Sequence, residues 1–339
     1  MFDFNTRVVP YLTPLEHEDI VRLLERDGLS FDEGADAIAL VDDIDGNIAA
    51  TASLFGSVIR MVAVDPARQE SGLSAMAISS LMEASRMNGS SRLFLFTKPE
   101  TAPRFASLGF RNIAETSAVS LLETGAPGIT DYREYLAERR VHDAGGPKIG
   151  CIVVNCNPFT LGHRYLMERA SEACSRFYVI VVEENMSRFS FEDRYEMVRL
   201  GTGDIRNMTL LRSGPYAVSS ATFPTYFLKD RGEKSAALQQ TRLDLALFLR
   251  LYVPALGINV RFVGTEPMSP VTNMYNDAMR EVLVPSGVEV VEVERMPSEF
   301  GDPVSASAAR AAMDSGDISR MSSYLPAATL DYLKERRLI

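Results

Sequence analysis

The pattern of apolar and polar positions changes once along the chain, near residue 145. Before that point, short apolar segments alternate with polar turns, and one longer segment has the apolar spacing of a helix. The segments predicted as strands are 37–41, 48–54, 58–64 and 93–97, and the predicted helix covers 73–87. The first part of the chain therefore predicts an α+β domain.

After residue 148 the pattern becomes a repeat of strand and helix. Continuous apolar runs, which are typical of parallel strands covered on both faces, occur at 149–155 and 177–182, and further strands are predicted at 260–264 and 288–293. Helical spacing follows the first run, and Ser190 begins a helix after the second. This alternation predicts a Rossmann-like, doubly wound α/β domain with a parallel sheet, whose ligands bind at the carboxyl ends of the strands.

The turn-rich sequence DAGGP at 143–147 separates the two patterns. We therefore expect one domain at 1–143 and a second at 148–339. Residues 1–147 contain 13 Lys+Arg and 22 Asp+Glu, whereas residues 148–339 contain 22 and 23. The second domain thus has far more cations for each acid, which suits a polyphosphate ligand.

Composition excludes several classes of protein. The net charge of −10 argues against a nucleic-acid binder, and we find no apolar run long enough to span a membrane. The N-terminal sequence does not resemble a secretory signal, and the three cysteines form no CxxC pair. We therefore expect a cytoplasmic protein with reduced thiols, no partner nucleic acid, no membrane and no protein metal site.

A candidate anion site follows the predicted strand at 149–155. The segment NCNPFTLGH, residues 155–163, leads directly into a predicted helix, whose free backbone N–H groups and dipole favour negative charge. Gly162 would let a phosphate approach the backbone, and the His163 ring could donate a hydrogen bond to a phosphate oxygen. Cys156 is more readily explained as a packing thiol than as a nucleophile, since no further histidine is available as its base.

A second segment near the C-terminus offers similar chemistry. The sequence VSASAAR occupies residues 304–310 and precedes a helix-prone stretch. Ser305 or Ser307 is suited to cap that helix, and Arg310 follows one turn later. Hydroxyls, backbone N–H groups and a guanidinium would then converge on one point.

Together the two segments resemble the T/H-x-G-H and I-S-x-[ST]-x-x-[RK] signatures of the nucleotidylyltransferase superfamily. The resemblance implies catalytic roles for His163, Thr160 and Arg310 around the phosphates of ATP. The expected nucleotide-binding residues are Asn155, Asn157, Gly162, Arg194, Gly264, Tyr275, Ser305 and Ser307. Arg194 is equally explained as a surface cation, and Tyr275 as part of a helix cap.

The segment VGTEPMSPVT at 263–272, read with the two signatures, resembles the citrate lyase ligase family. That family joins an N-terminal GNAT-like acetyltransferase domain to the nucleotidylyltransferase domain. QESGLS at 69–74 resembles a GNAT loop, although Ser74 stands where Gly or Ala is usual. This departure, with no cation in the loop, favours a docking or structural role for the first domain over catalysis.

The family resemblance implies a specific reaction. Acetate would attack ATP to give acetyl-adenylate, with Mg²⁺ bound through the nucleotide, and the acetyl group would pass to a thiol on the citrate lyase acyl carrier subunit. Two alternatives remain open from the residues alone. One is another nucleotidylyltransferase, similar to phosphopantetheine adenylyltransferase, and the other is an acetyl-CoA-dependent N-acetyltransferase.

Overall fold

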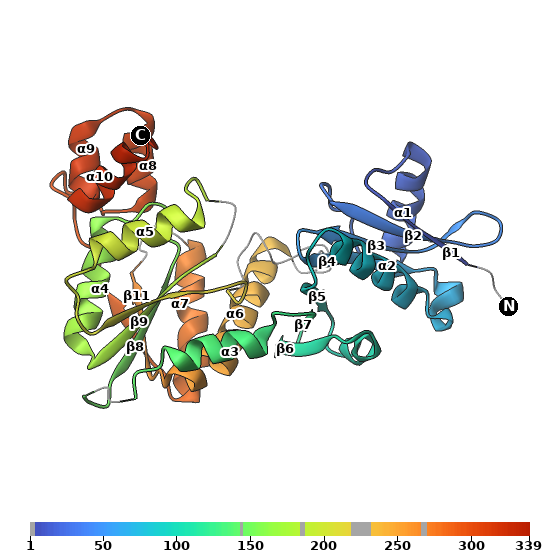
Figure 1. The fold of residues 1–339 in the computed structure, drawn as a ribbon, viewed down its shortest axis with the longest axis horizontal. Helices are drawn as coiled ribbons and strands as arrows, with labels where there is room; N and C mark the ends of the chain where they lie inside the picture. Colours follow the sequence, from blue (N-terminus) through green and yellow to red (C-terminus); the bar gives the residue numbers. More distant parts are fainter. Residues whose placement is uncertain (1–3, 143–144, 184–186, 218–231, 266–269) are drawn as a thin grey trace. The chain divides into compact units, whose positions relative to one another are not determined.

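The computed structural model describes residues 4–142, 145–183, 187–217, 232–265 and 270–339 (Figure 1). Within these ranges the chain forms two compact units. The first is drawn from Met1–Tyr132 and Val218–Ala246, and the second from Arg133–Ala217 and Leu247–Ile339. Helices α3 (Ile129–Glu138) and α6 (Gly232–Leu256) each have residues in both units. The domain limits of 1–143 and 148–339 stay a prediction.

The first unit contains a seven-stranded sheet in the order β1-β2-β3-β4-β5-β7-β6. Only the β4–β5 pair is parallel, and the other neighbours run antiparallel. The strands are β1 (Asn5–Val9), β2 (Ala37–Asp42), β3 (Ile48–Phe55), β4 (Val58–Val64), β5 (Leu93–Thr97), β6 (Arg111–Glu115) and β7 (Ser120–Thr124). Helices are α1 (Pro14–Arg26) and α2 (Leu73–Met87), with short 3₁₀ turns at η1 (Pro66–Ser71) and η2 (Ala102–Leu108).

Both faces of this sheet are buried, because successive side chains of a strand point to opposite faces. In β2, Ala39 and Val41 pack in one core with residues of α2, whereas Ile38 and Leu40 pack in another with residues of α1. Helix α1 begins at a capping box, in which Thr13 and the Glu16 side chain satisfy each other's backbone N–H groups.

Strands β4 and β5 pair only near their starts, at Val58–Phe94 and Ile59–Leu95. A cavity of about 270 Å³ lies beyond this point and is lined by residues of both strands, including Val62 and Phe96. Ser74, in the first turn of α2, also lines it. A mixed sheet with a helix after β4 is the GNAT-like α+β arrangement, so the predicted fold class of the first part is confirmed.

The second unit contains a five-stranded sheet in the order β10-β9-β8-β11-β12, and every neighbouring pair is parallel. The strands are β8 (Ile149–Val154), β9 (Arg176–Val181), β10 (Met208–Arg212), β11 (Val260–Gly264) and β12 (Glu289–Val293). Helices α4 (Leu161–Ala173), α5 (Phe191–Gly201) and α7 (Pro270–Leu283) also belong to this unit, followed by a short η4 turn (Val284–Ser286). The predicted doubly wound, Rossmann-like class is confirmed.

The order of the strands defines where a ligand should bind. From β8 the chain proceeds through β9 to β10 on one side, and then β11 and β12 lie on the other side. Such a reversal creates a switch point between β8 and β11, where ligands of open α/β sheets bind. The two strands are paired only at Val260–Gly150 and Arg261–Cys151, near their amino ends. Their carboxyl ends are therefore not held together by the sheet.

The C-terminal part of the second unit consists of three helices, α8 (Ala306–Asp314), α9 (Ile318–Tyr324) and α10 (Ala327–Glu335). Figure 1 shows them grouped together, with α10 close to α5. The Tyr332 hydroxyl donates to Asp193 Oδ1 at 2.8 Å, which fastens α10 to α5. None of the helices in the described ranges is both long enough and apolar enough to cross a bilayer.

Candidate active site

The loop that follows β8 is anchored by apolar side chains beneath it. Cys156 has a φ of 53°, and this left-handed turn bends the chain while its side chain enters the core. Phe159 is fully buried and lies so close to Gly201 that a Cβ there would meet its ring at 2.4 Å. Burial raises the pKa of the Cys156 thiol well above its ordinary value, so this cysteine is a packing group and not a nucleophile.

His163 is held by the start of α4. Thr160 is the N-cap, and its hydroxyl accepts from the His163 backbone N–H at 3.3 Å. In return, the Thr160 backbone N–H donates to His163 Nδ1 at 3.1 Å. The arrangement is a capping box in which an imidazole replaces the usual Glu or Gln. Because Nδ1 accepts, the proton of the neutral ring lies on Nε2, which is then a hydrogen-bond donor.

The surroundings keep this ring neutral. Burial, which is the larger cause, and the positive charge of Arg295 together lower the pKa of His163 to about 4. A ring that is neutral at pH 7 can donate through Nε2 without a change of protonation. The structure thus assigns His163 a single state over the physiological pH range.

A pH dependence of stability follows from the lowered pKa. The folded pKa of about 4 lies below the ordinary value of about 6.5. The neutral ring therefore stabilises the fold above pH 6.5, and this contribution is lost as the pH falls through 4. We expect His163→Asn to be about 1–2 kcal/mol less sensitive than the wild type to a shift from pH 7 to pH 4.5. Urea unfolding at both pH values measures the free energy of unfolding of each protein. An equal loss of this free energy in the variant and the wild type would contradict the prediction.

The second segment reaches the loop through Arg310. Ser305 is the N-cap of α8 and accepts from the Ala308 backbone N–H at 3.0 Å. From the first turns of that helix, Arg310 Nη1 donates to the Asn157 carbonyl at 2.5 Å, and Nη2 donates to Ser307 Oγ at 3.1 Å. Two segments about 150 residues apart in sequence are thereby brought to one place.

The two segments also touch at Gly162. A Cβ at this position would lie 3.0 Å from the Val304 carbonyl oxygen and 3.4 Å from Val304 Cγ1. The space beside Gly162 is thus occupied by the chain that leads into α8. The sequence suggested that this glycine admits a phosphate, and the structure adds that it admits the second segment.

We expect Gly162→Ala to separate the two segments, because the new methyl group would meet a backbone oxygen that has no rotamer to change. Even a small shift of α8 away from α4 would misplace groups that must act together, and we expect it to lower turnover about 10–100-fold. Steady-state kinetics of the purified variant measure it. Gly203→Ala is a matched control, since its nearest atom would be 3.8 Å from the new Cβ. Unchanged turnover in Gly162→Ala would refute the close-approach argument.

Arg194 lies beneath the loop with no exposed surface. Its Nη1 donates to the Asn155 carbonyl at 2.7 Å, to Asn155 Oδ1 at 2.5 Å and to the Val182 carbonyl at 2.8 Å. Its Nε donates to the Phe189 carbonyl at 3.2 Å. The side chain therefore ties the ends of β8 and β9 together. It is not the surface cation that the sequence allowed, and its predicted nucleotide contact stays a prediction.

The two predicted asparagines extend the same network. Asn155 Nδ2 donates to Ser187 Oγ at 3.1 Å, and Asn157 Oδ1 accepts from the Phe189 backbone N–H at 3.2 Å. Both amides thus hold the segment after β9 against the loop after β8. Their side chains position the backbone of the candidate site.

Gly264 ends β11, and the next residue contacts a cation that the sequence reasoning missed. Arg295, two residues past β12, donates through Nε to the Thr265 carbonyl at 2.8 Å. It also influences the pKa of His163, as described above. The rule that ligands bind at the carboxyl ends of strands could have singled it out, since it lies two residues past the predicted strand 288–293.

Tyr275 lies in the second turn of α7 and is partly buried. The structure describes Thr265 and resumes at Pro270, so Glu266 to Ser269 of the VGTEPMSPVT segment lie outside the described residues. The roles of Tyr275 and Gly264 at a nucleotide site stay predictions.

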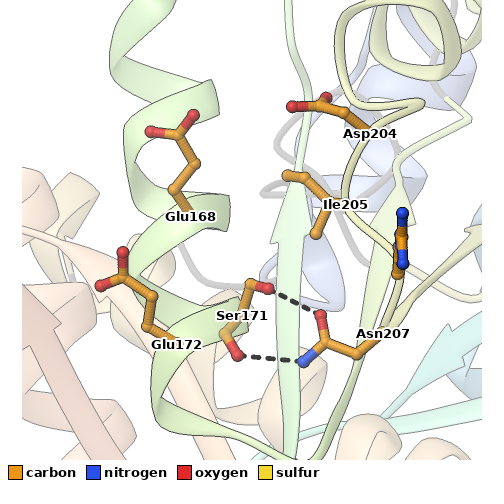
Figure 2. Close-up of a pocket in the computed structure, with 7 residues that line it drawn as sticks. Glu168, Ser171, Glu172, Asp204, Ile205 and Asn207 are labelled. Atoms are coloured by element: carbon orange, nitrogen blue, oxygen red, sulfur yellow. Dashed lines mark hydrogen bonds between the residues drawn. The ribbon is translucent and has the colours of Figure 1, made fainter.

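A separate hollow of about 290 Å³ lies between α4 and the turn before β10 (Figure 2). Figure 2 shows Ser171 and Asn207 directed toward each other, and Asn207 Nδ2 donates to the Ser171 carbonyl at 2.9 Å. The carboxylates of Glu168, Glu172 and Asp204 line the same hollow together with one cation, Arg206. A lining with three acids and one cation is less suited to a phosphate than the loop after β8, so that loop is the candidate anion site.

Among the described residues, no three His, Cys, Asp or Glu side chains are grouped so that they could hold a metal ion. The groups that converge on the loop are instead an imidazole N–H, guanidinium groups and the N-terminal N–H groups of α4. These are donors for anions.

The second unit has a parallel sheet with a switch point between β8 and β11. The capped His163 lies in the segment after β8, and Arg310, far away in sequence, is bonded to the same segment. These features define a Rossmann-like domain of the nucleotidyltransferase type. Comparison with known families makes this more specific. The chain belongs to the citrate lyase ligase family, since the family described as Citrate lyase ligase C-terminal domain matches residues 149–333. The expected resemblance is thereby confirmed.

Relatives of known name match almost the whole chain. The [citrate [pro-3S]-lyase] ligase of Klebsiella pneumoniae is 37% identical over 323 residues, covering 94% of this chain and 92% of its own. The ligase of Escherichia coli K12 is 35% identical and covers 93% and 90%. Among solved structures, Thermotoga maritima TmcAL bound with alpha-thio ATP matches 57% of this chain and 56% of its own, at 14% identity and a TM-score of 0.37.

Proposed function

We propose that the chain activates acetate with ATP and acetylates the prosthetic-group thiol of the citrate lyase acyl carrier subunit. In the first step an acetate oxygen attacks the α-phosphorus, the bond from that phosphorus to the bridging oxygen breaks, and pyrophosphate leaves. In the second step the thiol sulfur attacks the acetyl carbonyl carbon and releases AMP, while the thiol proton passes to solvent. Acetate, ATP and thiol thus yield thioester, AMP and pyrophosphate.

Family membership supports the choice of reaction, and the site geometry supports its location. The observation that carries the location is the hydrogen bond from Arg310 to the Asn157 carbonyl, because it joins the two signature segments. His163 Nε2–H, the Arg310 guanidinium and the helix N-termini of α4 and α8 would then surround the triphosphate. They would bind the leaving pyrophosphate and stabilise the charge that develops on it.

Mg²⁺ fits this site only through the nucleotide. In the part of the chain that the structure describes, no three His, Cys, Asp or Glu side chains are grouped so that they could hold a cation. Phosphate oxygens would therefore supply the ligands, as is usual for Mg²⁺ bound with ATP. When bound, the ion would neutralise charge on the β- and γ-phosphates, while the protein orients them.

We place the reaction in the cytoplasm, where thiols stay reduced. Cys151, Cys156 and Cys174 are all buried and unpaired in disulfides, which agrees with such a compartment. The net charge of −10 gives no reason to expect a nucleic-acid partner.

The test is pyrophosphate release from ATP by the purified protein with acetate, propionate or citrate. We expect release that depends on acetate, and AMP formation when the deacetylated carrier subunit is added. A stable dinucleotide product would support a phosphopantetheine adenylyltransferase-like enzyme instead. Acetyl transfer from acetyl-CoA without any response to ATP would move the activity to the first unit.

A further inference from the structure

Asn157 makes hydrogen bonds to two different segments of the second unit. Its backbone carbonyl accepts from Arg310 Nη1 at 2.5 Å, and its side-chain Oδ1 accepts from the Phe189 backbone N–H at 3.2 Å. The first bond reaches α8, and the second reaches the segment between β9 and α5. One residue of the loop after β8 therefore connects two segments that are far apart in sequence.

Phe189 is a fixed partner for the Asn157 side chain. Its ring is only 3% exposed and packs in the core of the second unit. Its carbonyl accepts from Arg194 Nε at 3.2 Å, and Arg194 has no exposed surface. Because both the ring and the carbonyl of Phe189 are held, its N–H has a defined position and restrains the Asn157 amide.

The guanidinium of Arg310 has weaker contacts on its own helix. It is partly exposed, and its Nη2 donates at 3.1 Å to the hydroxyl of Ser307, an exposed residue one turn earlier. A second link between α8 and the segment after β9 is the Arg188–Asp314 ion pair, whose side chains are 35% and 67% exposed. Exposed pairs of this kind contribute little. The Asn157 carbonyl is thus the main restraint on Arg310 among the residues with described positions.

The geometry points to an indirect role for Asn157. We propose that it is a positioning residue, which couples the segment after β9 to Arg310 and so sets the place of the guanidinium in the triphosphate site. Without its side-chain acceptor, the Asn157 backbone would lose the restraint from Phe189, and its carbonyl could turn away from Arg310. The inference rests on the proposed function, because it explains how one group of that site is held.

The first measurement compares the steady-state kinetics of two variants. Asn157→Ala removes the Oδ1 acceptor, and we expect kcat to fall about 10–100-fold because Arg310 is misplaced. Asn157→Asp keeps an oxygen acceptor at the same position but has no amide N–H group. It should recover most of kcat, while its negative charge raises KM for ATP. Asn88→Ala is the matched control, since Asn88 is an exposed residue at the end of α2 in the first unit.

The second measurement is a double-mutant cycle with Arg310→Ala. If Asn157 acts through Arg310, adding Asn157→Ala to Arg310→Ala should cause little further loss of kcat/KM for ATP. Independent roles would instead make the two losses multiply. Circular dichroism verifies that each variant is folded. If Asn157→Ala is not folded, Asn157→Gln replaces it, because its amide oxygen is displaced by one methylene group and should cause the same kind of loss.

The outcomes separate this inference from the proposed function. Wild-type kcat in folded Asn157→Ala overturns the inference and leaves the proposed function intact. Losses that multiply in the double variant also overturn it, and so does a kcat in Asn157→Asp as low as in Asn157→Ala, since the amide N–H would then be the important group. If the wild type releases no pyrophosphate from ATP with acetate, the proposed function fails, and this inference fails with it.

Discussion

His163→Asn should lower kcat about 100–1000-fold while the protein stays folded. The Asn side chain can replace Nδ1 as acceptor for the Thr160 N–H, so the start of α4 keeps its cap. It has no group at the position of Nε2, so the proposed donor to the phosphates is lost. Removal of one well-aimed donor of this kind costs about 3 kcal/mol of transition-state stabilisation. Steady-state kinetics and thermal unfolding of the same preparation measure both parts of the expectation.

Two further variants complete this experiment. His163→Gln extends an amide N–H toward the position of Nε2 and should recover part of the lost kcat. His142→Ala removes an exposed histidine of the second unit and should have no effect. Full activity in His163→Asn would mean that the imidazole is a structural cap alone, and the catalytic assignment of this residue would be withdrawn.

Arg310→Ala should lower kcat/KM for ATP by a similar factor of about 100–1000. The substitution removes a cation from the proposed triphosphate site, and it leaves the Asn157 carbonyl without its guanidinium donor. Arg310→Lys restores the charge but cannot hold both Asn157 and Ser307, so it should recover only part of the activity. The salt dependence of ATP binding should weaken in Arg310→Ala, because one charge contact is lost.

A control variant on α8 distinguishes phosphate binding by Arg310 from a role in holding α8 in place. Asp314 ends α8 and forms an ion pair with Arg188 at 2.5 Å, so Asp314→Asn weakens the attachment of the helix without removing Arg310. We expect near-normal kinetics in Asp314→Asn. Equal losses in Asp314→Asn and Arg310→Ala would show that Arg310 acts only by holding α8 in place.

Much of the fold could be predicted, because its strands have strong local patterns. The apolar run at 149–155 corresponds to β8 (Ile149–Val154), and the segment 73–87 to α2 (Leu73–Met87). Strand β10 was missed, since its five residues, MTLLR, give too short a signal to separate from a loop. The pairing of β11 with β8 could not be predicted either, because the two strands are far apart in sequence and local patterns do not specify long-range pairing.

The candidate site was predicted from its two segments, but the roles within it needed the structure. Arg194 is separated in sequence from the backbone carbonyls that it binds, so its burial could not be inferred from spacing. The sequence explained Gly162 by the approach of a phosphate, but in the structure the residue that comes close to it is Val304. Arg295 belongs to no recognised motif, and only the meeting of β11 and β12 at one edge draws attention to it.

The hydrogen-bonded cap on His163 limits the nucleophiles that this site can use. A ring that accepts through Nδ1 and already has its proton on Nε2 can donate a hydrogen bond, but it cannot take a proton from an incoming group. In the proposed reaction His163 would therefore not deprotonate the attacking oxygen, which favours a nucleophile that is already ionised. A carboxylic acid meets this requirement at neutral pH, whereas an alcohol does not.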